Sequence, residues 1–329
     1  MQTTSVVKVL AAWLLGLMLV VAGFIATVSV LNGQLYSPEH QVRLYLDALR
    51  DGDGEKALGL LNASVPDGAN PTLLDGEALS RGSDPIEDLE VGEARGAGGD
   101  RVEVPVTYTV DGVATSTVFP LQRTGTEWGF FNVWRFEPTV LPTVEVSALN
   151  SVVAAVNGVD VGLPDGRAAL AALYPTALTA EYEGRYFSAP ARHATITSRE
   201  NPPPPLALAT EATPELTQAV DDQLHAFLDG CAEQTVFQPT NCPFNYPTNE
   251  RLAGDISWSI AEYPSATITP GNGGWSLATL RGTARIETRL RDFFSGAVRD
   301  VSEAVPFEFE ADLVVTEDAI TVTPVVRYR

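Results

Sequence analysis

The sequence predicts an α+β protein in which one long apolar helix precedes two folded units, each built from a helix and an antiparallel sheet. Three patterns support this. Residues Val9–Leu31 form an uncharged apolar run of 23 residues. Apolar residues then recur at helical spacing after residue 37 and again after residue 213. Each helical stretch is followed by segments in which apolar and polar residues alternate, as in half-buried strands.

The apolar run is long enough to be a transmembrane helix. About 20 apolar residues cross the ~30 Å hydrocarbon core of a bilayer, and this run exceeds that length. A cleaved signal peptide has a shorter core, of roughly 7–15 residues, and ends in an Ala-x-Ala site. Ala22-Gly23-Phe24-Ile25-Ala26 lacks that spacing. We therefore expect residues 9–31 to be an uncleaved signal anchor.

The charges that flank the run predict its orientation. Lys8 precedes it, and the next basic residue is Arg43. The positive-inside rule then places residues 1–8 in the cytoplasm as a short tail and the bulk of the chain outside. The expected location is the cell membrane, crossed once, with an extracytoplasmic C-terminus.

The two cysteines, Cys231 and Cys242, are the only ones in the chain. A structural zinc site needs four ligands, and no histidine lies near this pair in the sequence. In an oxidising compartment the natural outcome is a disulfide. We predict that Cys231 and Cys242 are bonded to each other, in agreement with an extracytoplasmic location.

The part of the chain after the apolar run is acidic. Of 21 Lys and Arg residues only Lys8 precedes residue 32, so the remainder carries 20 basic and 42 acidic residues, a net charge of −22. This balance argues against nucleic acid and against electrostatic docking on an anionic membrane. It indicates a soluble, mutually repelling surface, with a basic partner or divalent cations as the alternative. Asp51-Gly52-Asp53-Gly54 only partly matches a calcium-binding loop.

Residues 37–137 begin with helices. Ser37 is a good N-cap and Pro38 suits the first helical position. One helical face then carries the apolar residues Val42, Tyr45, Leu46 and Leu49. The segment 51–54 should end this helix, and a second short helix should include residues 57–61.

Strands should follow in the same region. Val102, Val104, Val106, Tyr108 and Val110 share one face of a predicted strand, and Asp111-Gly112 predicts a hairpin turn. The partner strand should end near Leu121, and Thr124–Thr126 should turn into another strand. We expect one side of that strand to pack against the first helix; lining an apolar pocket is the alternative. This side carries Trp128, Phe130, Trp134 and Phe136.

The remaining chain divides into three parts. Residues 147–200 read as a small all-β module with a hairpin at Asn157-Gly158, a second strand pair around Glu183-Gly184 and a helical turn at 168–173. Residues 201–205 form a proline-rich linker. Residues 206–329 repeat the helix-then-strands order.

In this last part Thr213 should cap a helix that ends near Cys231. Residues 275–290 should form one hairpin arm. In the segment 307–313, apolar and acidic residues alternate. We expect a strand there with one buried and one solvent-exposed face.

The segment Ser37–Leu61 resembles the opening of a nuclear-transport-factor-like, or ketosteroid-isomerase-like, domain. The similarity rests on Tyr45-Leu46-Asp47-Ala48-Leu49, on Gly52-Asp53 and on Ala57-Leu58. The stretch that ends in Cys242-Pro243-Phe244 is similar to the last domain of an uncharacterised group of actinobacterial membrane-anchored proteins. The resemblance implies cone-shaped α+β domains over residues 37–137 and, more loosely, 206–329. The superfamily includes isomerases, dehydratases and many domains without known chemistry, so fold likeness does not assign an activity.

Residue patterns give little support for catalysis. The three histidines, His40, His193 and His225, fall in separate predicted elements, where surface positions are expected. An isomerase-like site needs a carboxylate base and an oxyanion donor inside the cone. Tyr45 lies on the apolar stripe of its helix and Asp47 lies off it. We therefore assign no catalytic, cofactor-binding or metal-binding residues and expect no cofactor.

Two classes of function fit these patterns. The favoured one is a non-enzymatic, membrane-tethered extracytoplasmic protein that binds or scaffolds an unknown component of the cell envelope. The alternative is an isomerase-like enzyme or small-ligand sensor with a pocket in residues 37–137. A filled cone would favour the first class, and a deep pocket holding a buried carboxylate would favour the second.

Overall fold

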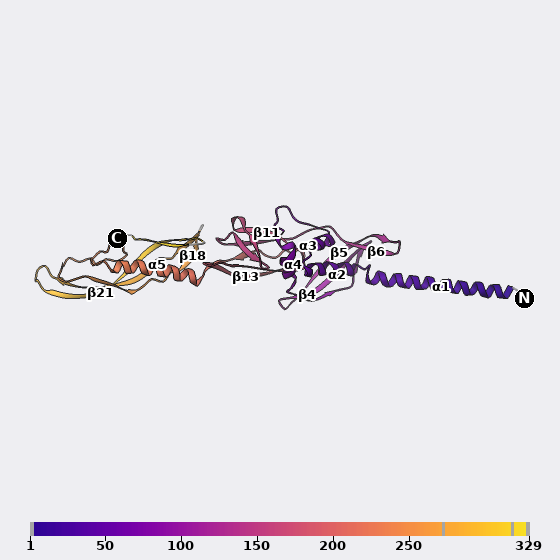
Figure 1. The fold of residues 1–329 in the computed structure, drawn as a ribbon, viewed down its shortest axis with the longest axis horizontal. Helices are drawn as coiled ribbons and strands as arrows, with labels where there is room; N and C mark the ends of the chain where they lie inside the picture. Colours follow the sequence, from indigo (N-terminus) through magenta and orange to yellow (C-terminus); the bar gives the residue numbers. More distant parts are fainter. Residues whose placement is uncertain (1–2, 272–273, 317–318, 327–329) are drawn as a thin grey trace. The chain divides into compact units, whose positions relative to one another are not determined.

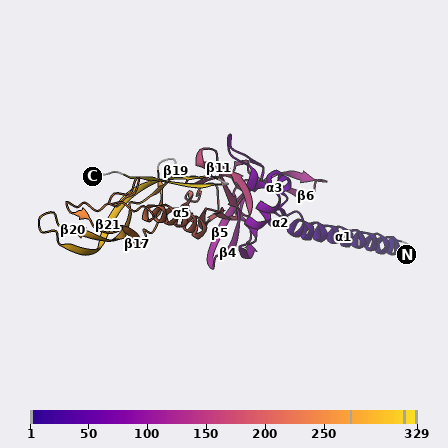
Figure 2. The ribbon, with the colours of Figure 1, turned by 60° about the vertical axis from the view of Figure 1, so that its left-hand side comes forward.

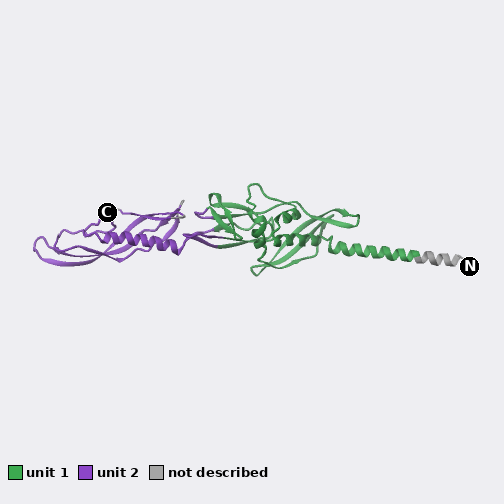
Figure 3. Ribbon diagram, viewed as in Figure 1, with its two compact units in different colours: residues 1–147, 152–180, 191–207 green, residues 148–151, 181–190, 208–329 purple. Residues whose placement is uncertain are grey.

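The computed structural model describes residues 3–271, 274–316 and 319–326, and these form a mixed α/β fold in two compact units. Figure 3 colours the units. Unit 1 comprises residues 1–147, 152–180 and 191–207, and unit 2 comprises residues 148–151, 181–190 and 208–329. The predicted β module, residues 147–200, is thus divided between the two units, and the proline-rich residues 201–205 belong to unit 1.

The chain begins with one long helix, α1 (Thr3–Gln34). Its described side chains, from Trp13 onward, are largely exposed and apolar. Within the described residues, this is the one helix long and apolar enough to cross a membrane. The predicted apolar helix is confirmed.

Unit 1 continues with helices α2 (Pro38–Asp51), α3 (Gly54–Leu61) and α4 (Gly76–Ser83), and a 3₁₀ turn, η1 (Thr72–Leu74). The predicted cap is present, because the Ser37 hydroxyl accepts a hydrogen bond from the His40 amide. Gly52 ends α2 with φ +71°. At Gly54 a Cβ atom would lie 1.9 Å from the Leu74 carbonyl oxygen, so only glycine fits between α2 and α3.

The main sheet of unit 1 has the order β2-β4-β5-β6, with β3 paired to β4. The strands are β2 (Ile86–Val91), β3 (Arg95–Gly98), β4 (Arg101–Val110), β5 (Val113–Glu127) and β6 (Phe131–Phe136). Val110 pairs with Val113 around the predicted Asp111-Gly112 turn. Helix α2 lies beside this sheet (Figure 1), and the apolar residues of its predicted face, Val42, Tyr45, Leu46 and Leu49, are all buried.

The predicted turn at Thr124–Thr126 is wrong. Strand β5 continues to Glu127, and the turn that leads into β6 spans Glu127–Phe130. The pairing register with β6 shifts between Arg123 and Gly125, which marks a β-bulge, and the strand continues beyond it. The expected aromatic face is therefore wrong as well: of its four residues only Phe136 is buried, and Trp128 and Phe130 lie in the turn and not on β6.

Short strands complete unit 1. Strands β1 (Ala63–Ser64) and β7 (Thr139–Val140) pair in parallel, and β8 (Thr143–Ala148) lies between β11 (Arg167–Ala171) and β14 (Leu206–Leu208). The hairpin at Asn157-Gly158 is confirmed by β9 (Val153–Val156) and β10 (Val159–Gly162). A 3₁₀ turn, η2 (Pro164–Gly166), follows it. The helical turn expected at 168–173 is wrong: β11 occupies this segment, because its backbone pairs with β8.

Besides β8 and β14, whose last residues Ala148 and Leu208 belong to unit 2, two further strands contribute residues to both units, β12 (Thr176–Glu183) and β13 (Phe187–Ile196). They are adjacent in one sheet, which confirms the strand pair predicted around Glu183-Gly184. In unit 2, Phe187 pairs with Ala212 of β15 (Glu211–Ala212).

Unit 2 lays one helix, α5 (Pro214–Ala232), beside a sheet of order β16-β20-β21-β22, with β17 paired to β20 (Figure 1). The strands are β16 (Arg251–Leu252), β17 (Ser257–Glu262), β20 (Leu280–Arg291), β21 (Val298–Val315) and β22 (Ile320–Val325). Thr213 caps α5, as predicted. The core lies between the apolar face of α5 and the inward faces of the strands. It includes Leu216, Val220, Leu224, Leu228, Ile286, Phe307 and Phe309.

The single hairpin arm expected over 275–290 is wrong. Strand β19 (Gly274–Leu277) pairs with β18 (Ile268–Gly271), and the chain then turns before β20 begins at Leu280. The Ala278 amide donates to the Thr267 carbonyl, which extends the β18–β19 pairing by one residue. Trp275 stacks on Phe187, with ring centroids 3.8 Å apart.

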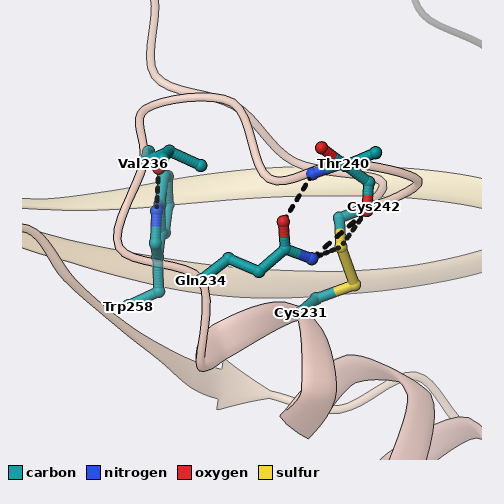
Figure 4. The surroundings of a disulfide bond; sticks show 6 residues. All are labelled: Cys231, Gln234, Val236, Thr240, Cys242 and Trp258. Atoms are coloured by element: carbon teal, nitrogen blue, oxygen red, sulfur yellow. Dashed lines mark hydrogen bonds between the residues drawn. A yellow bond between two sulfur atoms is a disulfide. The ribbon is translucent and has the colours of Figure 1, made fainter.

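The predicted disulfide is present. Cys231, in the last turn of α5, is bonded to Cys242, and their Cα atoms are 5.7 Å apart. Figure 4 shows the loop between them. The Gln234 side chain accepts a hydrogen bond from the Thr240 amide (2.7 Å) and donates one to the Thr240 carbonyl (3.2 Å). The Trp258 indole donates to the Val236 carbonyl (2.8 Å), which fastens the loop to β17.

Replacing both cysteines, Cys231→Ser and Cys242→Ser, should lower the free energy of unfolding of unit 2 by about 3 kcal/mol, because a short covalent loop restricts the unfolded chain. Denaturant unfolding, followed through the fluorescence of tryptophans, measures this. Reduction of the unsubstituted protein should give the same loss. Equal denaturation midpoints with and without the bond would contradict the prediction.

Candidate functional site: the β20–β21 turn

The two residues considered for isomerase-like chemistry do not face a common space. Tyr45 is fully buried, and its hydroxyl donates to the Tyr174 carbonyl at 2.7 Å. Burial raises the pKa of Tyr45 well above its ordinary value, so this hydroxyl stays protonated. Asp47, two residues later on α2, is exposed. The structure therefore does not bring a carboxylate to Tyr45 from this helix.

The space between α2 and the sheet is occupied by aromatic rings. The Tyr45 ring lies 5.6 Å from Phe119 and 5.5 Å from Phe136. Phe119 also stacks on Tyr174, with centroids 5.9 Å apart. Phe119 and Tyr45 are fully buried. These four side chains, Tyr45, Phe119, Phe136 and Tyr174, pack against one another between α2 and the sheet.

His193 and His225 belong to different units, and each has its own local partner. The His193 ring is 3.0 Å from the Thr179 hydroxyl, in unit 1. The His225 ring packs on Tyr263, whose hydroxyl donates to Asp229, in unit 2. Among the described residues, no group of three or more His, Cys, Asp or Glu side chains is placed to hold a metal ion.

The most distinctive exposed feature of unit 2 is the turn between β20 and β21, residues Asp292–Ala297, which we call the aromatic turn. Phe294 is fully exposed and Phe293 is 59% exposed. The neighbouring Val298 and Leu252 are about half exposed. Such a group of apolar side chains at one end of a sheet is typical of a contact surface.

The aromatic turn is an ordered structure. The Asp292 carboxylate accepts hydrogen bonds from the Ser295 amide (2.7 Å), the Ser295 hydroxyl (2.8 Å) and the Phe294 amide (3.0 Å). These bonds lower the pKa of Asp292 below its ordinary value, with the Ser295 amide contributing most. Asp292 and Ala297 also bond through their backbones. The conformation that exposes Phe294 is therefore held in place before any partner arrives.

Arginines flank the exposed rings. Arg251 lies over the Phe293 ring, 4.7 Å from its centroid. Arg251 is also directly opposite Arg291 in the strand register. Like charges opposite each other on neighbouring strands repel and cost stability. An unfavourable local arrangement of this kind, here two arginines on facing strand positions, is expected mainly at functional sites.

Further along β21, Arg299 forms an ion pair with Glu250, which raises the pKa of the guanidinium. Arg251 and Arg291 thus lie near the exposed rings, while Arg299 is paired with an acidic residue.

Sequence reasoning missed this site. The available signal was Asp292-Phe293-Phe294-Ser295-Gly296, in which two adjacent phenylalanines sit within turn-forming residues. Adjacent strand residues point to opposite faces of a sheet, so both rings could not have entered one core. Two adjacent aromatic residues in a turn follow neither the helical nor the strand period, so periodic patterns do not reveal them.

Comparisons with known proteins return no match: no family model, no curated protein and no solved structure matches this chain.

The aromatic turn should loosen in acid. The folded-state pKa of Asp292 lies below its ordinary value of 3.8, so the carboxylate stabilises the turn fully above pH 3.8, and this contribution disappears as the pH falls through the lower folded-state value. Amide exchange at Phe294 and Ser295, measured by NMR as the pH is lowered, should report this loss. The variant Asp292→Asn should remove the pH response. A carboxyl that titrates at 3.8 or above would contradict the assignment.

Proposed function

We propose that this protein is a non-enzymatic, membrane-tethered binding or scaffolding protein whose two units lie outside the cytoplasm. Helix α1 supplies the tether, with residues 1–8 on the cytoplasmic side. The Cys231–Cys242 bond supports an oxidising location for unit 2. We propose the cell envelope as the compartment. We also propose that residues 37–137 and 206–329 are related to cone-shaped α+β domains.

The packing of unit 1 supports binding or scaffolding over isomerase-like chemistry. Tyr45, Phe119, Phe136 and Tyr174 pack into one another where a substrate would sit. An active site would need a buried carboxylate directed into that space, and Asp47 is exposed. The interior of unit 1 acts as a hydrophobic core that keeps the sheet rigid.

The observation that carries the proposed binding role is the full exposure of Phe294 in a turn ordered by Asp292. Preorganised aromatic side chains with a flanking arginine are common anchors of protein interfaces. Arg251 and Arg291 beside the rings favour a partner with an apolar pocket and an acidic rim. We therefore propose a protein of the cell envelope as the partner.

The proposed topology can be tested in cells. Protease added to intact spheroplasts should digest residues 37–329, because the positive-inside rule places them outside. A cytoplasmic protein should survive in the same sample as the control for intact membranes. Full protection of both units until detergent is added would show the opposite orientation.

The proposed binding surface can be tested by photo-crosslinking in cells. A benzophenone amino acid in place of Phe294 should give a discrete crosslinked product, because the ring should enter the partner's pocket. The matched control is the same amino acid in place of Val314, which is exposed on β21 but lies far from the turn in sequence.

Replacing Phe293 with serine beside the crosslinker should weaken the product by about 10-fold, the effect of losing one hot-spot side chain. Equal labelling from positions 294 and 314 would show that the aromatic turn has no specific partner.

A further inference from the structure

A second hairpin turn, between β5 and β6 in unit 1, lies beside helix α1. The Phe130 ring packs edge-on against Phe24 of α1, with centroids 5.2 Å apart. The Phe131 ring stacks on Tyr36, just after the helix, at 4.5 Å. In both ribbon views, β6 extends from the body of unit 1 on the side where α1 leaves it (Figure 1 and Figure 2).

A side-chain amide fastens this hairpin to the helix. Asn32, in the last turn of α1, donates from Nδ2 to the Phe130 carbonyl at 2.7 Å. Its Oδ1 atom accepts from the Asn132 amide at 3.0 Å. Strand β6 is at the edge of its sheet, so Asn32 takes the place of a neighbouring strand there. The hairpin and the end of α1 are thus held together by two hydrogen bonds and two ring contacts.

The contact with Phe24 sets the depth of the hairpin relative to the apolar run. The hydrocarbon core accommodates about 20 helical residues, so its outer boundary lies between Val28 and Leu31 when residues 9–31 fill it. Phe24 is four to seven residues inside that boundary, which is roughly 6–10 Å at 1.5 Å per residue. The Phe130 ring, in contact with Phe24, must lie at a similar depth.

The turn itself carries the side chains that such a position favours. Trp128 is 86% exposed and Phe130 is 52% exposed, although the latter touches α1. Trp128 has φ +54°, a region that bulky residues rarely occupy. Tryptophan and tyrosine concentrate where hydrocarbon meets water, because their rings have an apolar body and a polar edge. Glu127 is the one charged residue between Arg123 and Arg135.

We propose that the β5–β6 turn, residues Trp128–Phe131, inserts into the outer leaflet of the same bilayer that α1 crosses, with the Phe130 ring in the hydrocarbon and the rest of the turn near the interface. The inference rests on the proposed membrane anchor. Binding is by aromatic insertion, so it needs no basic residues and is compatible with the acidic composition. Unit 1 then touches the membrane at two points, the helix and the hairpin, and its rotation about the α1 axis is restricted.

The test uses the full-length protein in phosphatidylcholine vesicles that contain a lipid with a nitroxide quencher near its headgroup. Both native cysteines are in the disulfide, so a single new cysteine takes an environment-sensitive fluorophore alone. Glu127→Cys places the label at the turn and keeps both aromatic residues. Val113→Cys is the matched control, because it is exposed at the opposite end of the same strand.

Lipid quenching at position 127 should exceed that at position 113 by at least about twofold, because only the former should reach the interface. Replacing Trp128 and Phe130 with serine in the Glu127→Cys protein should remove the difference. Asn32→Ala should reduce it, since the hairpin loses its link to α1. These results would support the inference.

A third label, Val20→Cys, separates the inference from the anchor on which it rests. If lipids with a deep quencher quench position 20 while position 127 stays open to aqueous iodide, the anchor stands and hairpin insertion is wrong. If position 127 is shielded from both lipid quencher and iodide, the turn contacts protein, and the inference is also overturned. If position 20 is not quenched, the anchor itself fails, and with it the inference.

Discussion

The burial of Tyr45 is the constraint on which the rest of unit 1 depends. Its ring fills the space between α2 and the main sheet, and its hydroxyl must find a partner there, because an unpaired buried hydroxyl costs free energy. The Tyr174 carbonyl supplies that partner, and the Tyr174 ring stacks on Phe119 of β5. The Tyr45 side chain thus ties helix α2 to the sheet and to a segment more than a hundred residues later. The small strands around Tyr174 become part of the same core.

In unit 2 the helix is attached to its sheet by different interactions. The stripe of α5 covers the sheet through aliphatic residues, and the end of the helix is fastened covalently by Cys231–Cys242. Trp258 and Phe244, with ring centroids 4.9 Å apart, pack the disulfide loop onto the core. The loop has little regular secondary structure, so the covalent bond and the Gln234 hydrogen bonds provide the order that strand pairing supplies elsewhere.

Much of the fold was predictable from local patterns. The caps Ser37 and Thr213, the stripes of α2 and α5, and the turns at Asp111-Gly112 and Asn157-Gly158 depend on residues near one another in the chain, and all were confirmed. The wrong predictions concern segments whose conformation depends on contacts with residues distant in the sequence. The segment 168–171 contains only alanine and leucine, which favour a helix, and its strand conformation comes from pairing with β8. The bulge after Arg123 moved the next turn, and with it the environment of Trp128 and Phe130.

The candidate site was less predictable than the fold. Exposure of Phe294 depends on where β20 ends and β21 begins, and the facing arginines depend on the β16–β20 register. Neither is encoded by spacing along one segment. The resemblance to cone-shaped domains drew attention to Tyr45 and Asp47, while the exposed aromatic residues lie in turns outside any such motif.

The pairing of the long strand β21 has a mechanical consequence. It pairs with β20 along residues 298–309 and with β22 along residues 310–315, while β17 pairs with the other side of β20. A tensile load applied at the turn, parallel to the strands, would pull β20 and β21 in the same direction. The hydrogen bonds to β17 and β22 would then be loaded in shear, all together, instead of opening one after another. Unit 2 is therefore built to resist stretching along its strands more than peeling from its edges.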